Sequence, residues 1–232
     1  MKHQTFFGYL TLSSILMLTP VKLGLAQTSN EFQLAQNPDN FYQECFRNNK
    51  NKNQGDMTRC AQLDYQQADK TLNQVYQQLR SQLPNTGKEL LKDAQLDWIS
   101  FRENEWVFSL SRMRLGTGSS MYSSVKAAFY SGLTKKRTVE LQAYVRGQTL
   151  LPNSGNYQAV DRHLNQVYQQ VRSSLGEQQQ LKLKSAQIAW LEFRDTSCEF
   201  ESYHFTNSNN SCLTRLTEQR VEKLSRLLPR NG

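Results

Sequence analysis

The sequence is short of the residues and patterns on which many enzymes and metal proteins depend. It holds three histidines and four cysteines in 232 residues, without a Cys-x-x-Cys pair, a Gly-x-Ser-x-Gly motif or a glycine-rich phosphate loop. These absences argue against a zinc site, a serine hydrolase and a nucleotide-binding enzyme. His163 and His204 each stand alone, and a lone histidine is more often a surface or packing residue than a base. We therefore predict a non-enzymatic protein with no cofactor and no metal.

Long apolar runs are also scarce. The main one, residues 6–18, is too short to cross a bilayer as a helix, and Lys2 precedes it. Small residues follow at the position where a signal peptidase cuts, so we predict a signal peptide over residues 1–26, removed before Gln27. A short membrane anchor is the alternative. A polar leader, residues 27–40, comes next. We expect a secreted or periplasmic protein with no stable membrane insertion after cleavage.

The chain contains the same pattern twice. Residues 94–102 recur as residues 186–194, and residues 72–78 recur as residues 164–170, both 92 positions later. In each copy of the first block, Ala, Trp and Phe follow one another at steps of four and three residues. Such steps place the three side chains on one face of a helix. We expect this large aromatic pair to act as a wedge that fixes how neighbouring helices pack.

A third repeated block sets the domain limits. Residues 133–137 match residues 216–220 at an offset of 83, so the first copy carries extra residues between its second and third blocks. Two copies of about 90 residues indicate tandem domains, because a solenoid needs shorter and more numerous repeats. We predict a first domain over residues 41–147, a linker over 148–156 and a second domain over 157–232.

The fold class follows from the spacing of apolar residues. Steps of three and four dominate, and no stretch alternates with period two. We predict an all-α protein of two tandem three-helix domains stabilised by disulfides. The first helix should begin near Asp56 or Thr58 and end at Pro84, and residues 86–89 have the form of a capping box that opens the second helix. The second helix should end at about Leu110. The third should span about residues 125–144, with Gly147 closing it. The helices of the second domain are predicted at about residues 157–175, 177–201 and 211–228.

The four cysteines form an even set, which usually pairs outside the cytoplasm. Three pairings are possible. Pairing Cys45 with Cys60 and Cys198 with Cys212 closes two loops of similar size and crosses no repeat boundary. A metal site is the rival interpretation, but these spacings lack the usual ligand pattern.

The register of the repeats suggests why the cysteines are unevenly distributed. Cys198 aligns with Trp106 at the offset of 92, and Cys212 aligns with Phe129 at the offset of 83. One copy is therefore expected to join its second and third helices by a disulfide, and the other by an aromatic pair.

The charge is positive and uneven. Residues 41–147 hold 16 basic and 10 acidic residues, whereas residues 148–232 hold 10 and 8. Such asymmetry favours anionic partners, such as an acidic envelope polymer or a carboxylate-lined cleft, although it can also be ordinary solubilising charge. We expect no nucleic acid, because the chain is predicted to be exported and lacks an aromatic–basic stacking motif.

The repeated side chains around the aromatic stripe have two interpretations. They can form one ligand site per domain, or a structural network that fixes helix register. We favour the structural network. Its predicted members are Asn73, Tyr76, Gln95, Trp98, Phe101, Arg102 and Arg137 in the first copy, and Asn165, Tyr168, Gln187, Trp190, Phe193, Arg194 and Arg220 in the second.

These motifs resemble a known family. Ala-Gln-x-x-Trp-x-x-Phe-Arg, the segment around Cys198, the segment 212–220 and the segment 60–76 are similar to the secreted bacterial LprI-type lysozyme-inhibitor domain. The resemblance spans about residues 41–232 in two copies. It implies small exported helical domains with two disulfides, paired as Cys45–Cys60 and Cys198–Cys212. The chain departs from the family pattern in that each copy holds half of the expected disulfide set, and no lipidation cysteine is present.

The resemblance implies a binding protein that blocks a lysozyme-like cell-wall glycosidase. Such enzymes use two carboxylates in a cleft. We predict that Arg112, Arg114 and Tyr122, in the long loop region of the first domain, enter that cleft by matching its charge and supplying an aromatic anchor. The alternative is an envelope structural or adaptor protein that binds an anionic polymer or a protein partner. A hydrolase is the least favoured function.

Overall fold

A computed structural model describes residues 40–49, 51–113, 115–150, 156–205 and 209–229. The predicted signal peptide and nearly all of the polar leader lie outside these residues. The described part is helical and contains no strand, which confirms the all-α prediction. Its helices are α2 (Asn40–Asn48), α3 (Gln54–Gln82), α4 (Asn85–Arg112), α5 (Tyr122–Val145), α6 (Tyr157–Ser173), α7 (Glu177–His204) and α8 (Asn209–Ser225).

The starts of α3 and α4 differ from the predicted caps. Asn53 caps α3, because its side chain accepts a hydrogen bond from the Asp56 amide at 3.0 Å and forms a capping box with that residue. The capping box predicted at residues 86–89 is wrong. Pro84 holds the N-cap position of α4 in extended backbone geometry, without a side-chain cap, and Thr86 lies inside the helix. The turn between α3 and α4 therefore takes only Leu83 and Pro84.

Gly147 ends α5 as predicted. Its φ angle is +68°, a left-handed conformation that glycine adopts without a steric penalty. The Gly147 amide donates to the Tyr144 carbonyl at 3.0 Å, and the Gln148 amide donates to the Ala143 carbonyl at 2.9 Å. These bonds satisfy carbonyls that the helix end would otherwise leave unpaired.

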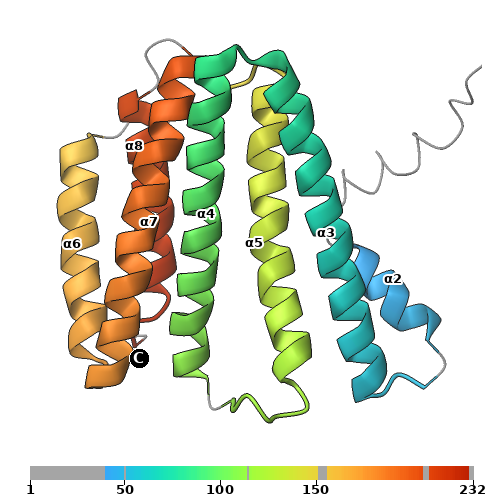
Figure 1. The fold of residues 1–232 in the computed structure, drawn as a ribbon. Helices are drawn as coiled ribbons and strands as arrows, with labels where there is room; N and C mark the ends of the chain where they lie inside the picture. The colour runs from blue at the N-terminus through green and yellow to red at the C-terminus, as the bar shows by residue number, and fades with distance from the viewer. Residues whose placement is uncertain (1–39, 50, 114, 151–155, 206–208, 230–232) are drawn as a thin grey trace, which may run out of the picture. The chain divides into compact units, whose positions relative to one another are not determined.

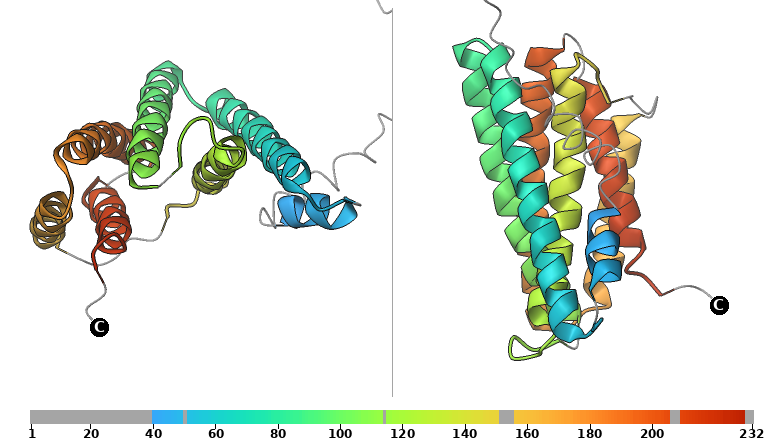
Figure 2. Two further views of the ribbon diagram at one scale, coloured as in Figure 1. Left: turned by 90° about the horizontal axis from the view of Figure 1, so that it is seen from below. Right: turned by 90° about the vertical axis from the view of Figure 1, so that its right-hand side faces the viewer.

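The two sequence copies correspond to α3–α5 and α6–α8, and they meet through their middle helices (Figure 1). Within the copies, α3 packs along α5 and α6 packs along α8, while α4 packs mainly against α7 of the other copy. The end-on view in Figure 2 shows α6, α7, α4 and α3 in an arc, with α5 and α8 on its inner side. The copies are therefore joined side by side along the antiparallel pair α4 and α7.

A stacked aromatic pair lies at the centre of this contact. The rings of Phe101 and Phe193 are 5.5 Å apart and within 3° of parallel. The two residues are equivalent in the repeat, so α4 and α7 present the same face to each other, as at a two-fold axis. Trp98 and Trp190 are buried beside them, and one hydrophobic core runs through both copies.

Both predicted disulfides are present. Cys45 pairs with Cys60 and joins α2 to α3, with Cα atoms 5.6 Å apart. Cys198 pairs with Cys212 and joins α7 to α8, with Cα atoms 5.5 Å apart. Helix α2 was not predicted. Its short sequence has no counterpart in the second copy, and the disulfide fixes it against α3.

Candidate functional site

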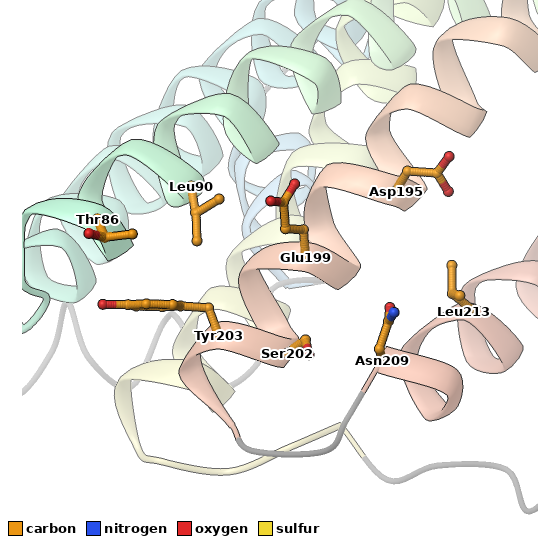
Figure 3. Close-up of a pocket in the computed structure, with 8 residues that line it drawn as sticks. All are labelled: Thr86, Leu90, Asp195, Glu199, Ser202, Tyr203, Asn209 and Leu213. Carbon is orange, nitrogen blue, oxygen red and sulfur yellow. The ribbon is translucent and has the colours of Figure 1, made fainter.

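An open groove lies over the last turns of α7, between the first turns of α4 and α8 (Figure 3). Its volume is about 630 Å³. The lining side chains combine carboxylates, hydroxyls, an amide, a phenol and two leucines: Thr86 and Leu90 from α4, Asp195, Glu199, Ser202 and Tyr203 from α7, and Asn209 and Leu213 from α8. Six of these eight residues carry a polar group, so the groove suits a polar or charged group of a ligand.

Helical spacing on α7 produces this lining. Asp195, Glu199 and Tyr203 follow one another at steps of four, so they share one outward face. The opposite face carries Trp190 and Phe193 in the core. Burial of that aromatic stripe therefore sets the direction in which the groove residues point.

The two groove carboxylates differ in their surroundings. Asp195 accepts from its neighbour Arg194, whose Nη2 lies 2.7 Å from the Asp195 carboxylate. Glu199 is exposed and has no ion-pair partner within the part of the chain that the structure describes. Glu199 is therefore the groove carboxylate that can accept a cation without giving up an internal bond.

Tyr203 supplies an exposed aromatic surface, with 44% of the residue accessible to solvent. Its ring lies against the backbone of α4 at Gly87, where a Cβ atom on residue 87 would be only 2.9 Å from the ring carbon Cε1. The glycine thus makes room for the ring, and α4 holds the ring in place.

The disulfide of the second copy lies directly beneath the groove. Cys198 precedes Glu199, Cys212 precedes Leu213, and both cysteines are fully buried. The bridge ties the helices that form the floor and one wall, so it helps to hold the groove in shape.

The predicted contact residues lie at the far end of α4 from the groove. Arg112 is the last residue of α4 and Tyr122 the first of α5, so both are helical where a loop was predicted, and Arg114 lies outside the described residues. The Arg112 guanidinium is 6.0 Å from the Phe108 ring, and its Nη2 donates to the Leu227 carbonyl at 3.4 Å. The Tyr122 ring packs edge-on against Trp106 at 5.8 Å. Arg112 is exposed, whereas Tyr122 is half-buried.

The residues of the predicted repeat network occupy matching places in the two copies. Arg137 donates to Gln95 at 3.2 Å, and Arg220 donates to Gln187 at 2.9 Å. The guanidinium of Arg137 lies 5.4 Å from the Phe193 ring, and that of Arg220 lies 5.8 Å from the Phe101 ring. Each arginine thus covers the phenylalanine of the other copy. Arg102 and Arg194 likewise cover Trp98 and Trp190 of their own helices, at 5.0 and 5.3 Å.

The smaller members of that set lie farther out. Asn73 and Asn165 are exposed, and each donates to the aspartate four residues earlier, at 3.1 and 3.3 Å. Tyr76 and Tyr168 are half-buried and pack against the edge of the core.

A buried acid that sequence reasoning missed joins the copies. Glu105 of α4 is 1% exposed and accepts from Arg220 Nη1 at 2.7 Å, while Lys223 Nζ lies 3.1 Å from its other oxygen. Burial acts to raise the pKa of Glu105, but Arg220 and Lys223 outweigh it and lower that pKa. Glu105 follows Trp98 and Phe101 at helical spacing, and this position on the core face was the available signal.

A second buried network also crosses between the copies. Glu201 of α7 accepts from the Tyr144 hydroxyl and from Arg215 Nη2, both at 2.6 Å. Glu140 of α5 accepts from Arg137 Nη1 at 2.5 Å. Burial raises the pKa of Glu201, whereas the pKa of Glu140 is lowered because the attraction of Arg137 and Arg215 exceeds the effect of burial. These two networks place buried charged groups between the copies and hold the copies together.

The described residues offer no metal site, since no three His, Cys, Asp or Glu side chains gather there as a metal would require. Among the same residues, no helix combines the length and apolarity needed to cross a membrane.

Comparison with known proteins agrees with the two-copy architecture. The sequence model of the family described as lysozyme inhibitor LprI matches residues 45–141 and 154–224. An uncharacterized protein of Rhizobium meliloti (strain 1021) is 32% identical over 102 residues, which cover 38% of this chain and 71% of that protein. A crystal structure of an uncharacterized protein from Burkholderia thailandensis superposes with a TM-score of 0.60 at 16% identity, over 82% of this chain and 95% of that chain.

The structural likeness shows a shared fold. The family match falls on both copies and includes both disulfides and both Trp/Phe blocks. The chain therefore belongs to the lysozyme inhibitor LprI family.

Proposed function

We propose that this chain is an exported inhibitor that binds a lysozyme-type cell-wall glycosidase and blocks it without performing chemistry. Membership of the LprI family is the observation that carries the proposal. The two disulfides fit a protein that works in an oxidising compartment outside the cytoplasm.

The groove suits such a partner electrostatically. Many lysozymes are basic. A chain with a formal net charge of +6, once Lys2 and Lys22 are removed with the predicted signal peptide, would repel them at long range. Asp195 and Glu199 provide a local acidic surface on this otherwise basic chain. The proposed contact therefore places the groove against a basic patch of the enzyme.

The basic end of α4 is a second proposed contact. Arg112 and Arg114 would face the carboxylate pair of the glycosidase cleft, with Tyr122 as the aromatic anchor. Helix α4 separates this end from the groove by roughly 40 Å, at 1.5 Å of rise per residue. The two surfaces can therefore be tested separately.

A turbidity assay tests the proposal. A basic lysozyme clears a suspension of cell walls in the presence of increasing amounts of the purified protein, and we expect clearing to slow at micromolar excess. The double variants Glu199→Gln/Tyr203→Leu and Arg112→Gln/Arg114→Gln then show which end is used, because inhibition is lost only when the contact surface is altered. Unchanged clearing with the unaltered protein would refute the proposal for that enzyme.

A further inference from the structure

We infer that the groove seats a single arginine or lysine side chain of a protein partner, against Glu199 and Tyr203, and that the described chain offers one such seat. The identity of the partner as a glycosidase rests on the proposed function. The chemistry of the seat rests on the surroundings of Glu199 and Tyr203.

The fold repeatedly holds a guanidinium between an aromatic ring and a carboxylate. A cation over a ring face is stabilised by the ring quadrupole, and a carboxylate alongside adds a charge-assisted hydrogen bond. The arrangements of this kind are Arg102 with Trp98 and Glu103, Arg194 with Trp190 and Asp195, Arg137 with Phe193 and Glu140, and Arg220 with Phe101 and Glu105.

The groove has the ring and the carboxylate but no cation of its own. Glu199 and Tyr203 stand one turn apart on the outward face of α7 (Figure 3). The nearby Arg194 is held by Asp195 and by the Trp190 ring. Within the described residues, no arginine or lysine lies over Tyr203 or pairs with Glu199.

In the first copy, Val107 and Ser111 stand at the positions of Glu199 and Tyr203, and a cation of the chain itself lies nearby. At the repeat offsets, Asp195 corresponds to Glu103, Leu213 to Tyr130 and Asn209 to Lys126. The Lys126 ammonium lies 5.2 Å from the Tyr130 ring, whose hydroxyl donates to Glu103 at 2.5 Å. The first copy thus supplies its own cation.

The second copy has no internal cation at the equivalent of Lys126. Asn209 carries no charge where Lys126 stands in the first copy, and Leu213 replaces the tyrosine ring. The position of Glu199 is taken by Val107 in the first copy, so the second copy gains a carboxylate and loses the internal cation. This contrast is the reason for one seat in a chain with two repeats.

The shape of the groove fits a long basic side chain. Leu90 and Leu213 line it and can pack against the methylene stem, while the charged head reaches Glu199. The volume of about 630 Å³ leaves room for the neighbouring backbone of the partner. Hydroxyls of Thr86 and Ser202 are available to that backbone.

Amide NMR shifts of the full protein test the seat without any glycosidase. The probe is N-acetyl-arginine amide at millimolar concentration, with N-acetyl-glutamine amide as the uncharged control. We expect the arginine probe alone to shift amides of residues 86–90, 199–203 and 209–213. The shifts should disappear in Glu199→Gln/Tyr203→Leu and persist in Glu192→Gln, which removes the same charge from the exposed face of α7 outside the groove. Shifts spread over all surface carboxylates, or retained in the double variant, would overturn the inference.

Affinity for a basic lysozyme then tests the link to the proposed function. If the groove is the contact, Glu199→Gln weakens binding about tenfold, as expected for a lost charge-assisted bond, and Glu192→Gln leaves it unchanged. Arginine-probe shifts without lysozyme binding would refute the proposed function and keep the seat. Lysozyme binding that ignores Glu199, together with absent probe shifts, would refute the seat and keep the function.

Discussion

The two copies of one helical unit solve the same packing problem with different chemistry. In the second copy, the Cys198–Cys212 disulfide joins the middle and last helices. In the first, the Trp106 and Phe129 rings stand at the equivalent positions, 5.3 Å apart, which confirms the prediction from the repeat register. Tyr122 and Tyr130 complete that aromatic cluster. A covalent link and a group of rings can therefore hold the same pair of helices.

The difference also reaches the surface. The aromatic cluster and Lys126 occupy the position above the first clasp, whereas the compact disulfide leaves space for a groove above the second. The two copies therefore differ in the surface beside the joint between their middle and last helices.

The largest effect is expected where the copies depend on each other. Glu105→Gln leaves the buried Arg220 and the half-buried Lys223 with less than their full counter-charge. We expect a loss near the upper end of about 3–5 kcal/mol in the free energy of unfolding, the range for breaking a buried pair. Denaturant unfolding measures it. The equivalent residue in the second copy is Ser197, so Ser197→Ala is the matched control, and an equal loss there would contradict this account.

The second largest effect is expected for the contact of the Trp106 and Phe129 rings, which joins α4 to α5. Trp106 is 3% exposed, and Trp106→Ala should cost about 3–5 kcal/mol through the cavity it leaves among the rings. Trp106→Phe keeps a ring in the cluster and should retain most of the stability. Thermal unfolding of the two variants makes the comparison, and near-native stability of the alanine variant would mean that the rings do not replace the bridge.

The third effect concerns the Cys198–Cys212 disulfide, which joins α7 to α8. Cys198→Ala/Cys212→Ala should lower stability by about 3 kcal/mol, the entropic value for a loop of this length. Removing Cys45 and Cys60 in the same way releases α2, which packs mainly on α3. The core should therefore unfold at nearly the same denaturant concentration. Equal shifts of the main transition would show that α2 belongs to the cooperative core.

Acid should weaken the contacts between the copies. The folded-state pKa values of Glu105 and Glu140 lie below their ordinary value of 4.5, so their contribution to stability is present above that pH and is lost as pH falls through the lowered pKa values. Glu201, with a raised pKa, acts in the opposite direction and offsets part of the loss. Unfolding free energies between about pH 5 and 3 should fall less steeply in Glu105→Gln than in the unaltered protein. A steeper fall in the variant would contradict the assignment.

The smallest effect concerns the groove. Gly87→Ala places a methyl group 2.9 Å from the Tyr203 ring, which must move, whereas Gly132→Ala in α5 meets nothing within 4 Å. We expect Gly132→Ala to stabilise the helix by about 0.5–1 kcal/mol, and Gly87→Ala to stabilise less and to weaken binding of the arginine probe. Equal probe binding by both variants would show that the ring position is unimportant.

The helices, the disulfides and the Trp106–Phe129 contact could be predicted because each produces a local pattern in the sequence. The repeated Trp/Phe blocks and the two offsets predicted six helices, and the cysteine register predicted the Trp106–Phe129 contact. The sequence did not show that α4 would pack against α7. The stripe of Trp98 and Phe101 indicates a buried face but not which helix covers that face. That choice depends on three-dimensional complementarity between two copies of the same face.

The groove was missed for a related reason. Glu199 and Tyr203 look like ordinary exposed residues in the sequence, and their spacing of four on α7 acquires meaning only when Gly87 and Leu90 come beside them from the other copy. The acids on the core face, such as Glu105, were visible by spacing but resemble part of a solvated face, because acidic and basic residues alternate along the same helices.

The stacking of Phe101 on Phe193 has a consequence for how such a molecule can change over time. A face that fits its own duplicate would also fit a second molecule, so a chain with only one unit would need to self-associate at sufficient concentration to cover it. Fusing the units makes the encounter intramolecular and independent of concentration. It also frees each half from having to remain identical to the other, which allows one half to specialise in recognition while the other provides support.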